Sequence, residues 1–122
     1  MTEKQYEVII TPFAESALQT CYDYIRYELL AEETADKWLD RMENAIQGLS
    51  ILPRKYHTVE REPWHSNDIR CLSIIGYNIY YWINDNNMKV YIIDVVSHKM
   101  DQDKRLIESM LSHDRNADEG DA

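Results

Sequence analysis

The sequence has no long apolar run, few cysteines and no excess of basic residues, and each absence excludes a class of protein. No apolar segment approaches the ~20 residues that a membrane-spanning helix needs. The opening residues, MTEKQYEV, lack the charged-then-apolar form of a signal peptide, so we expect a cytoplasmic protein. The two cysteines, Cys21 and Cys71, fit no metal-ligand spacing and are too few for a disulfide framework. We therefore expect reduced thiols, no metal site and no cofactor.

The net charge is −9, which argues against simple nucleic-acid binding because a surface that binds phosphates is normally basic. The charge is unevenly distributed along the chain. Residues 1–53 carry ten acids and four bases, whereas residues 54–70 carry three acids and four bases. This short net-positive segment also holds His57 and His65, so it is the part of the chain that suits an anionic partner best.

Three consecutive runs of β-branched and aromatic residues dominate the second half of the chain. They are Ile69–Ile75, Tyr77–Ile83 and Met88–Val96. Gly76 separates the first two runs, and the polar turn-forming residues 84–87 separate the last two. This pattern predicts an antiparallel meander of three strands. Alternation places the odd-numbered residues of the middle strand on one face of the sheet and the even-numbered residues on the other.

Two amphipathic helices are predicted before the meander. The apolar run Tyr6–Ile10 is typical of a strand, and Thr11-Pro12 is typical of a helix N-cap followed by proline in the first turn. Apolar residues at helical spacing predict a first helix over about Pro12–Glu28 and a second one after a break near Leu30. The second helix has one apolar stripe, made of Ala35, Trp38, Leu39, Met42, Ala45, Ile46, Leu49 and Leu52. It must end before Pro53, because proline disfavours helical backbone in the preceding residue.

Residues 53–68 have two prolines and no periodicity, which predicts a long loop of the kind that often carries function. A short terminal helix is expected over Asp101–Ser112, so the element order is β-α-α-loop-β-β-β-α. This order predicts an α+β fold in which an antiparallel sheet carries both N-terminal helices on one face. We expect a single domain over residues 1–111 and an acidic, disordered tail over residues 112–122.

Seven segments follow one another in an order and spacing that together are fairly specific. They are Thr11-Pro12, Ala17-Leu18, Asp23-Tyr24-Ile25, residues 45–53, residues 69–72, residues 76–81 and residues 90–99. In the order and spacing of these segments, the chain resembles the RelE/ParE superfamily of bacterial toxins from type II toxin–antitoxin modules. The resemblance covers roughly residues 6–111, which is nearly the whole predicted domain.

The resemblance implies a compact toxin that a cognate antitoxin protein holds inactive in a hetero-oligomeric complex. It leaves the activity open. RelE-like members cut messenger RNA in the ribosomal A site, whereas ParE-like members inhibit DNA gyrase and are not nucleases. A third alternative is a degenerate member that only binds its antitoxin.

RNA cleavage of the RelE kind requires a deprotonated 2′-hydroxyl, stabilisation of the charged phosphorane and a proton for the leaving oxygen. Arginine matches phosphate oxygens, and histidine transfers protons near neutral pH. By the resemblance, the catalytic candidates are Arg70, His98, Lys99, Arg61 and His57, and the candidates for binding substrate are Arg54, Lys55, Trp64 and His65. Because these residues are present, we rank a ribosome-dependent endoribonuclease first.

Other features favour the alternatives. Met100 stands where the family commonly has a basic residue, no residue matches the C-terminal catalytic tyrosine of some members, and ribosome-directed members are usually basic. These departures favour gyrase inhibition. Structural roles also compete with catalytic ones. Arg70 would pair with a helix acid such as Glu43, Trp64 would pack the loop onto the sheet, and His98 would bind local carbonyls.

Overall fold

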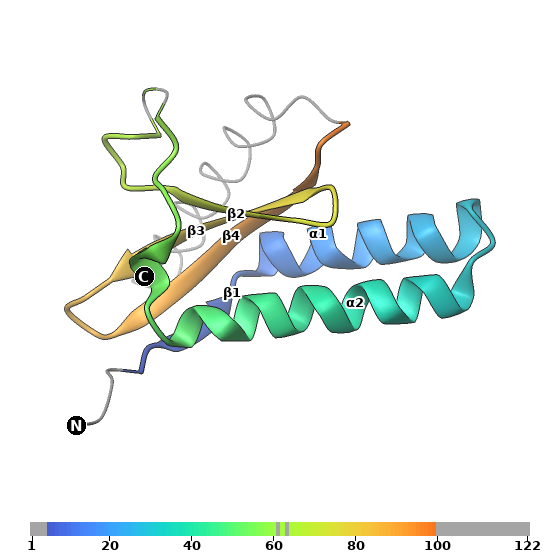
Figure 1. The fold of residues 1–122 in the computed structure, drawn as a ribbon, viewed down its shortest axis with the longest axis horizontal. Helices are drawn as coiled ribbons and strands as arrows, with labels where there is room; N and C mark the ends of the chain where they lie inside the picture. Colours follow the sequence, from blue (N-terminus) through green and yellow to red (C-terminus); the bar gives the residue numbers. More distant parts are fainter. Residues whose placement is uncertain (1–4, 61, 63, 100–122) are drawn as a thin grey trace, which may run out of the picture.

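The computed structural model describes residues 5–60, 62 and 64–99 of the chain. In order, the elements are β1 (Glu7–Ile10), α1 (Pro12–Asp23), the π-helical turn η1 (Tyr24–Glu28), α2 (Glu32–Gln47), the 3-10 turns η2 (Gly48–Ser50) and η3 (Pro53–Lys55), β2 (Arg70–Ile74), β3 (Tyr77–Asn84) and β4 (Lys89–Ser97). Both predicted helices and all four predicted strands are present (Figure 1). The predicted terminal helix, Asp101–Ser112, and the predicted tail lie outside the described residues.

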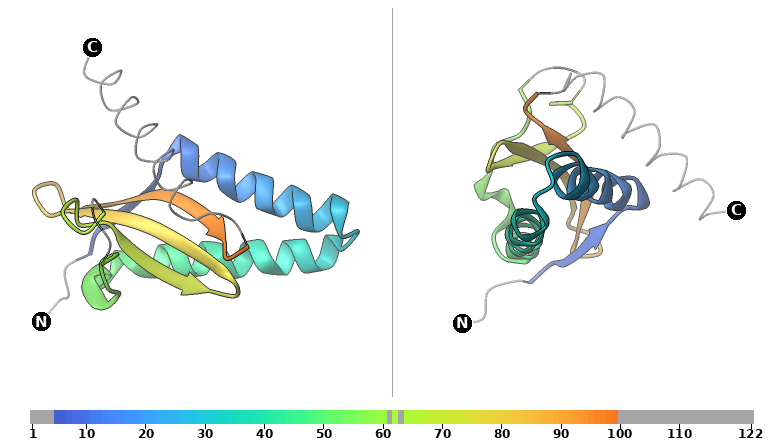
Figure 2. Two further views of the ribbon diagram at one scale, coloured as in Figure 1. Left: turned by 90° about the horizontal axis from the view of Figure 1, so that it is seen from above. Right: turned by 90° about the vertical axis from the view of Figure 1, so that its right-hand side faces the viewer.

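The two helices form a hairpin that covers one face of a four-stranded sheet (Figure 2). The strand order is β1-β4-β3-β2. β2, β3 and β4 make the predicted antiparallel meander, and β1 joins the edge of β4 in parallel, with Val8 opposite Val90. The predicted α+β fold is confirmed. The sheet is mixed rather than wholly antiparallel, because the chain crosses over through the helices between β1 and the meander.

Thr11 begins α1 as the sequence predicts. Its hydroxyl oxygen accepts a hydrogen bond from the Ala14 N–H at 3.3 Å, and the same hydroxyl donates to the Ile92 carbonyl at 2.7 Å. Pro12 follows in the first turn, where backbone N–H groups have no partner within the helix. The N–H that proline lacks therefore costs the helix no hydrogen bond. Because Thr11 is buried, one hydroxyl both caps the helix and ties it to β4.

The main core lies between the helical hairpin and the sheet. The α2 stripe contributes four buried side chains: Ala35, Trp38, Met42 and Ile46. The prediction that Leu52 belongs to this stripe is wrong, because α2 ends at Gln47 and Leu52 is 61% exposed. The sheet contributes Leu72, Ile79, Tyr81, Ile83, Val90, Ile92 and Val95. The predicted faces of β3 are confirmed, because its odd-numbered residues pack in this core whereas Tyr80 and Trp82 pack on the other face.

A second apolar cluster lies on the face of the sheet away from the helices. Its buried members are Trp64, Ile69, Tyr80, Ile93 and Val96. The pairing of β3 with β4 shifts between Tyr80 and Tyr81, so β4 holds one extra residue at this point, a β-bulge. Ile92 and Val95, three residues apart, therefore both pack in the main core, and Ile93 and Val96 both pack in the second cluster. Period-two alternation does not predict this change of face along β4.

The loop between η3 and β2 is fastened to the edge of the sheet. Thr58 makes an isolated bridge with Arg70, and the Val59 N–H donates to the Ile69 carbonyl at 2.7 Å. Trp64 extends the second apolar cluster and is only 4% exposed. In the part of the chain that the structure describes, no helix combines the length and the hydropathy that crossing a bilayer requires.

Candidate functional site

Arg70, the strongest catalytic candidate, opens β2 and binds the backbone of the preceding loop. Its guanidinium donates to the Tyr56 carbonyl at 2.6 Å and to the Arg54 carbonyl at 3.3 Å. The side chain is half-buried. Its contacts are carbonyls of the loop rather than Glu43, which lines a pocket between the helices. Arg70 therefore holds the loop on the sheet, a structural role with a different partner from the predicted one.

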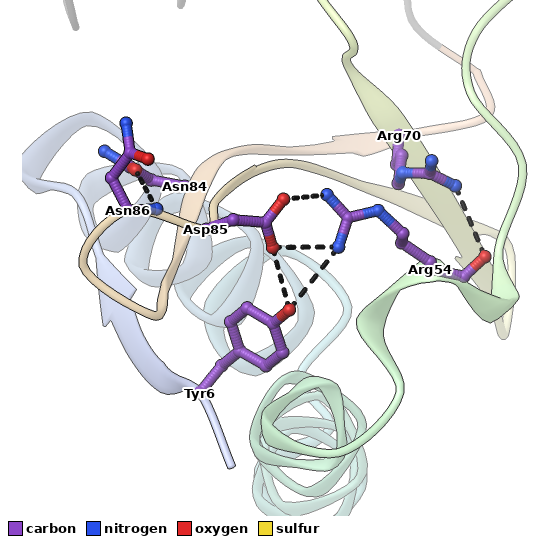
Figure 3. Close-up of polar contacts among 6 residues, drawn as sticks. All are labelled: Tyr6, Arg54, Arg70, Asn84, Asp85 and Asn86. Carbon is purple, nitrogen blue, oxygen red and sulfur yellow. Dashed lines mark hydrogen bonds and ion pairs between the residues drawn. The ribbon is translucent and has the colours of Figure 1, made fainter. Parts of the chain in front are cut away.

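Arg54, a candidate for binding substrate, forms an ion pair with the β3–β4 turn. Its two terminal nitrogens bind the two carboxylate oxygens of Asp85, one at 2.9 Å, and the Tyr6 hydroxyl donates to the same carboxylate at 2.8 Å (Figure 3). The hydrogen bond to Asp85 is the main reason that the pKa of Arg54 is raised. A phosphate that binds Arg54 must displace a carboxylate that already fits both arms of the guanidinium.

Tyr81 completes the attachment of this region to the core. It is fully buried, lies opposite Arg70 in the β2–β3 pair, and donates its hydroxyl to the Pro53 carbonyl at 2.6 Å. Burial raises the pKa of Tyr81 well above its ordinary value. This phenol therefore stays protonated and has a structural function.

His98 lies at the other end of the sheet, in a polar cluster at the end of β4. Its Nε2 is 2.8 Å from Asn78 Oδ1, and the Ser73 hydroxyl donates to the same oxygen at 2.6 Å. Because an amide oxygen only accepts, Nε2 carries a proton, and Nδ1 is the acceptor of the neutral ring. The Asn78 amide nitrogen donates in turn to the Tyr80 hydroxyl at 3.2 Å. We call His98, Asn78 and Ser73 the His98 cluster.

Cys71 lies on the same face of β2 as Ser73, with 4.0 Å between the thiol and hydroxyl. Burial is the main reason that the pKa of the Cys71 thiol is raised. A raised pKa keeps the thiol protonated near neutral pH and lowers its reactivity. Cys71 is thus a packing residue.

The remaining candidates lie in the loop and at the end of β4, and Lys55 and His57 flank Tyr56, whose carbonyl binds Arg70. Lys55 lies over the Tyr56 ring at 5.1 Å, and His57 and Lys99 are exposed. His65 is also exposed, with Nδ1 3.4 Å from the Thr58 hydroxyl. Arg61 lies outside the described residues. The ring of Trp64 is buried against the sheet, so it packs the loop and presents no face to a nucleic-acid base.

The sheet keeps Arg70 and His98 apart. Arg70 pairs with Tyr81 on β3, whereas Ser97, next to His98, pairs with Tyr77. Four residues of strand separate those positions, roughly 13 Å at ~3.3 Å per residue. The Arg70 side chain also shares the helix-facing side of β2 with Leu72, while the His98 cluster lies on the opposite face. The described residues therefore do not bring these two groups to one phosphate.

The partners that hold these candidates are not predictable from the sequence. Asp85 and Tyr6 bind Arg54, and Asn78 and Ser73 form the His98 cluster. Asp85 was visible only as a turn-forming residue, and alternation gave the face of Asn78 without its partner. No further signal in the sequence predicts these contacts, because each joins residues from different elements.

A pocket of about 350 Å³ lies where α1, α2 and β1 meet. Its apolar lining includes Ile10, Leu18 and Leu39, and its acidic lining is Glu15 and Glu43. None of the predicted site residues lines it. Within residues 5–60, 62 and 64–99, no three His, Cys, Asp or Glu side chains are grouped so that they could hold a metal ion.

Comparison with known families decides the class of protein. A family model described as the ParE toxin of the type II toxin–antitoxin system parDE matches residues 8–102. The chain belongs to the ParE toxin family. The predicted RelE/ParE resemblance is therefore confirmed over most of the chain. No curated protein matches this family member in sequence.

Two solved structures share the fold of this ParE-family chain. One, described as the chromosomal ParDE TA system from P. aeruginosa, has a TM-score of 0.63 and 15% identity, and the match covers 77% of this chain and 97% of that chain. The other is the RelBE2 toxin–antitoxin complex from Mycobacterium tuberculosis, with a TM-score of 0.54 and 21% identity, covering 79% of this chain and 97% of that chain. At these identities the likeness shows the fold alone.

Proposed function

We propose that this chain is the toxin of a type II toxin–antitoxin module and that it acts by binding, as a non-enzymatic inhibitor of DNA gyrase. The observation that carries this proposal is the separation of Arg70 from His98, which lie about four residues of strand apart on opposite faces of the sheet. Arg70 and Arg54 are engaged by the chain itself, and His98 lies on the opposite face of the sheet. The family match supports the same proposal, because ParE-like members of the superfamily inhibit gyrase.

The chemistry of RNA cleavage explains why this separation matters. A general acid or base must come within hydrogen-bond reach of the reacting oxygens, and the groups that stabilise the phosphorane must reach the same phosphate. Arg70 would first have to release two backbone carbonyls, and Arg54 would have to release a carboxylate. An inhibitor that acts by binding needs none of these rearrangements.

A ribosome-dependent endoribonuclease, the activity ranked first from the sequence, is the second candidate. The His98 cluster favours it. Asn78 orients the His98 ring and leaves Nδ1 as an acceptor, which is what a general base requires, and the exposed Lys99 follows directly. In this alternative, catalysis uses the end of β4 without Arg70.

We further propose that the chain binds an antitoxin protein in the pocket where α1, α2 and β1 meet. Both solved structures of similar fold are described as toxin–antitoxin systems. The pocket combines the apolar side chains of Leu18 and Leu39 with the carboxylates of Glu15 and Glu43. This lining suits an amphipathic helix that carries Lys or Arg beside its apolar face. Leu39→Asp is expected to abolish rescue by a co-expressed antitoxin from the adjoining reading frame while growth arrest persists.

The experiment that separates the two activities is expression of the chain without antitoxin, with growth measured and messenger RNA 5′ ends mapped. The proposal predicts growth arrest, no new 5′ ends at fixed codon positions, and equal arrest by His98→Ala. New ends that disappear in His98→Ala would establish the endoribonuclease instead. Normal growth with full antitoxin binding would leave only the degenerate member.

A further inference from the structure

The turn that joins α1 to α2 exposes four large apolar side chains. Tyr24 is 54% exposed, Tyr27 61%, Leu29 56% and Leu30 86%. We call these four residues the hairpin tip. They lie at the end of the helical hairpin, beyond the adjoining ends of the strands (Figure 1). Single exposed apolar residues are ordinary, but a group gathered on one projection is typical of an interaction surface.

The backbone of the hairpin tip has an unusual conformation. Residues 24–28 form a π-helical turn, which the Leu29 N–H closes by donating to the Tyr24 carbonyl at 3.2 Å. Leu30 follows with φ +50°, in the left-handed region that a residue with a side chain rarely adopts. Both features recur at functional sites. Here they coincide with the most exposed apolar side chain of the tip.

A network of polar contacts between α1, η1 and α2 supports the hairpin tip. Arg26 donates to Glu32 at 2.9 Å and to the Tyr22 hydroxyl at 3.1 Å, and that hydroxyl donates to Asp36 at 2.6 Å. The Arg26 guanidinium also lies 5.3 Å from the centre of the Tyr27 ring. Ile25 is buried and anchors the turn in the main core. An ordered surface loses less entropy on binding than a flexible one.

We propose that the hairpin tip is the surface by which this toxin docks on its target, entering an apolar pocket whose rim carries Lys and Arg. Charge selects this occupant, because residues 23–37 hold five acids and two bases around the tip. The inference rests on the proposed function, since an enzyme that handles DNA presents basic surfaces. A second copy of this chain fits less well, because it would bring two acidic rims and two charges of −9 together.

The test uses the double variant Tyr27→Ser/Leu30→Gly and the matched control Leu52→Gly. Leu52 is also a leucine with positive φ, +52°, and is 61% exposed, but it lies next to η3, away from the tip. In a supercoiling assay with purified bacterial gyrase, the double variant should need at least about tenfold more protein for half-maximal inhibition. Leu52→Gly should match the parent chain. Inhibition should also weaken as salt rises, because charge contacts are screened.

Equal inhibition by the double variant and by Leu52→Gly would overturn the inference and leave the proposed function intact. The inference would also be overturned if the parent chain sedimented as a homodimer and the double variant sedimented as a monomer. If the parent chain does not inhibit gyrase, the proposed function fails. Growth arrest on expression of the three proteins then tests the role of the tip. Arrest lost only in the double variant would support docking through the tip, and arrest by all three proteins would contradict it.

Discussion

Arg54 and Asp85 form an ion pair through both arms of the guanidinium, although 31 residues of sequence separate them (Figure 3). Tyr6 binds the same carboxylate, so one contact joins the N-terminal strand region, the loop before the meander and the β3–β4 turn. In the sequence, Arg54 had the features of a phosphate ligand. In the structure the guanidinium of Arg54 forms its ion pair with the carboxylate of Asp85.

Asp85→Ala should destabilise the fold modestly. Both partners are about half exposed, so the loss is expected to be ~0.5–1 kcal/mol, which lowers Tm by a few degrees. Thermal unfolding at pH 7 measures it. Glu33→Ala is the matched control, because it removes a more exposed pair with Lys37 and should change Tm less. Equal shifts in the two variants would contradict a special role for Arg54–Asp85.

Tyr81→Phe should affect stability differently at neutral and alkaline pH. At pH 7 the loss of the hydrogen bond to Pro53 is expected to cost about 1 kcal/mol. Because burial raises the pKa of Tyr81 in the folded chain, its stabilising effect is complete below the ordinary value of 10.0 and is lost as pH rises above it. Urea unfolding between pH 7 and 11 should therefore show a smaller alkaline decline for Tyr81→Phe. An unchanged decline would contradict this account.

Thr11→Ala should cost about 1–2 kcal/mol of unfolding free energy, because it removes both the cap of α1 and the buried bond to Ile92. Thr11→Ser keeps the hydroxyl and should recover most of that loss. Urea unfolding of the three proteins measures the difference. If Thr11→Ser were as unstable as Thr11→Ala, the hydroxyl would not be the stabilising group.

Leu30→Gly and Leu52→Gly should leave the fold as stable as the parent chain or raise its stability by up to ~1 kcal/mol. Glycine relieves the strain of a positive φ, and its greater freedom in the unfolded chain offsets part of the gain. Thermal unfolding provides the check. A marked loss of stability in Leu30→Gly would mean that this exposed side chain packs on the fold.

The parts of this fold that the sequence predicted depend on local signals. Thr11-Pro12 marks a helix start, the apolar stripe of α2 has helical period, and the side chains of β3 divide between the two faces with period two. The parts that it did not predict depend on pairing between distant segments. Nothing local indicates that β1 lies parallel to β4, or that the register shifts after Tyr80.

The same distinction applies to the candidate site. Residue type and the family resemblance made Arg70, Arg54 and Trp64 candidates for contact with RNA. Their contacts are backbone carbonyls, a carboxylate and the second apolar cluster, which bring together segments that composition cannot relate. The hairpin tip could not be predicted from the sequence either. Tyr24 and Leu30 are ordinary residues for the end of a helix, and only the structure gives their exposure.

Inhibition of purified DNA gyrase tests the central claim most directly. Supercoiling is measured while the parent chain, or the His98→Ala variant, is titrated against the enzyme without ribosomes or messenger RNA. The account predicts that both proteins inhibit at the same concentration, because the His98 cluster takes no part in binding. Gyrase that stays fully active at every concentration of a folded, growth-arresting toxin would contradict it.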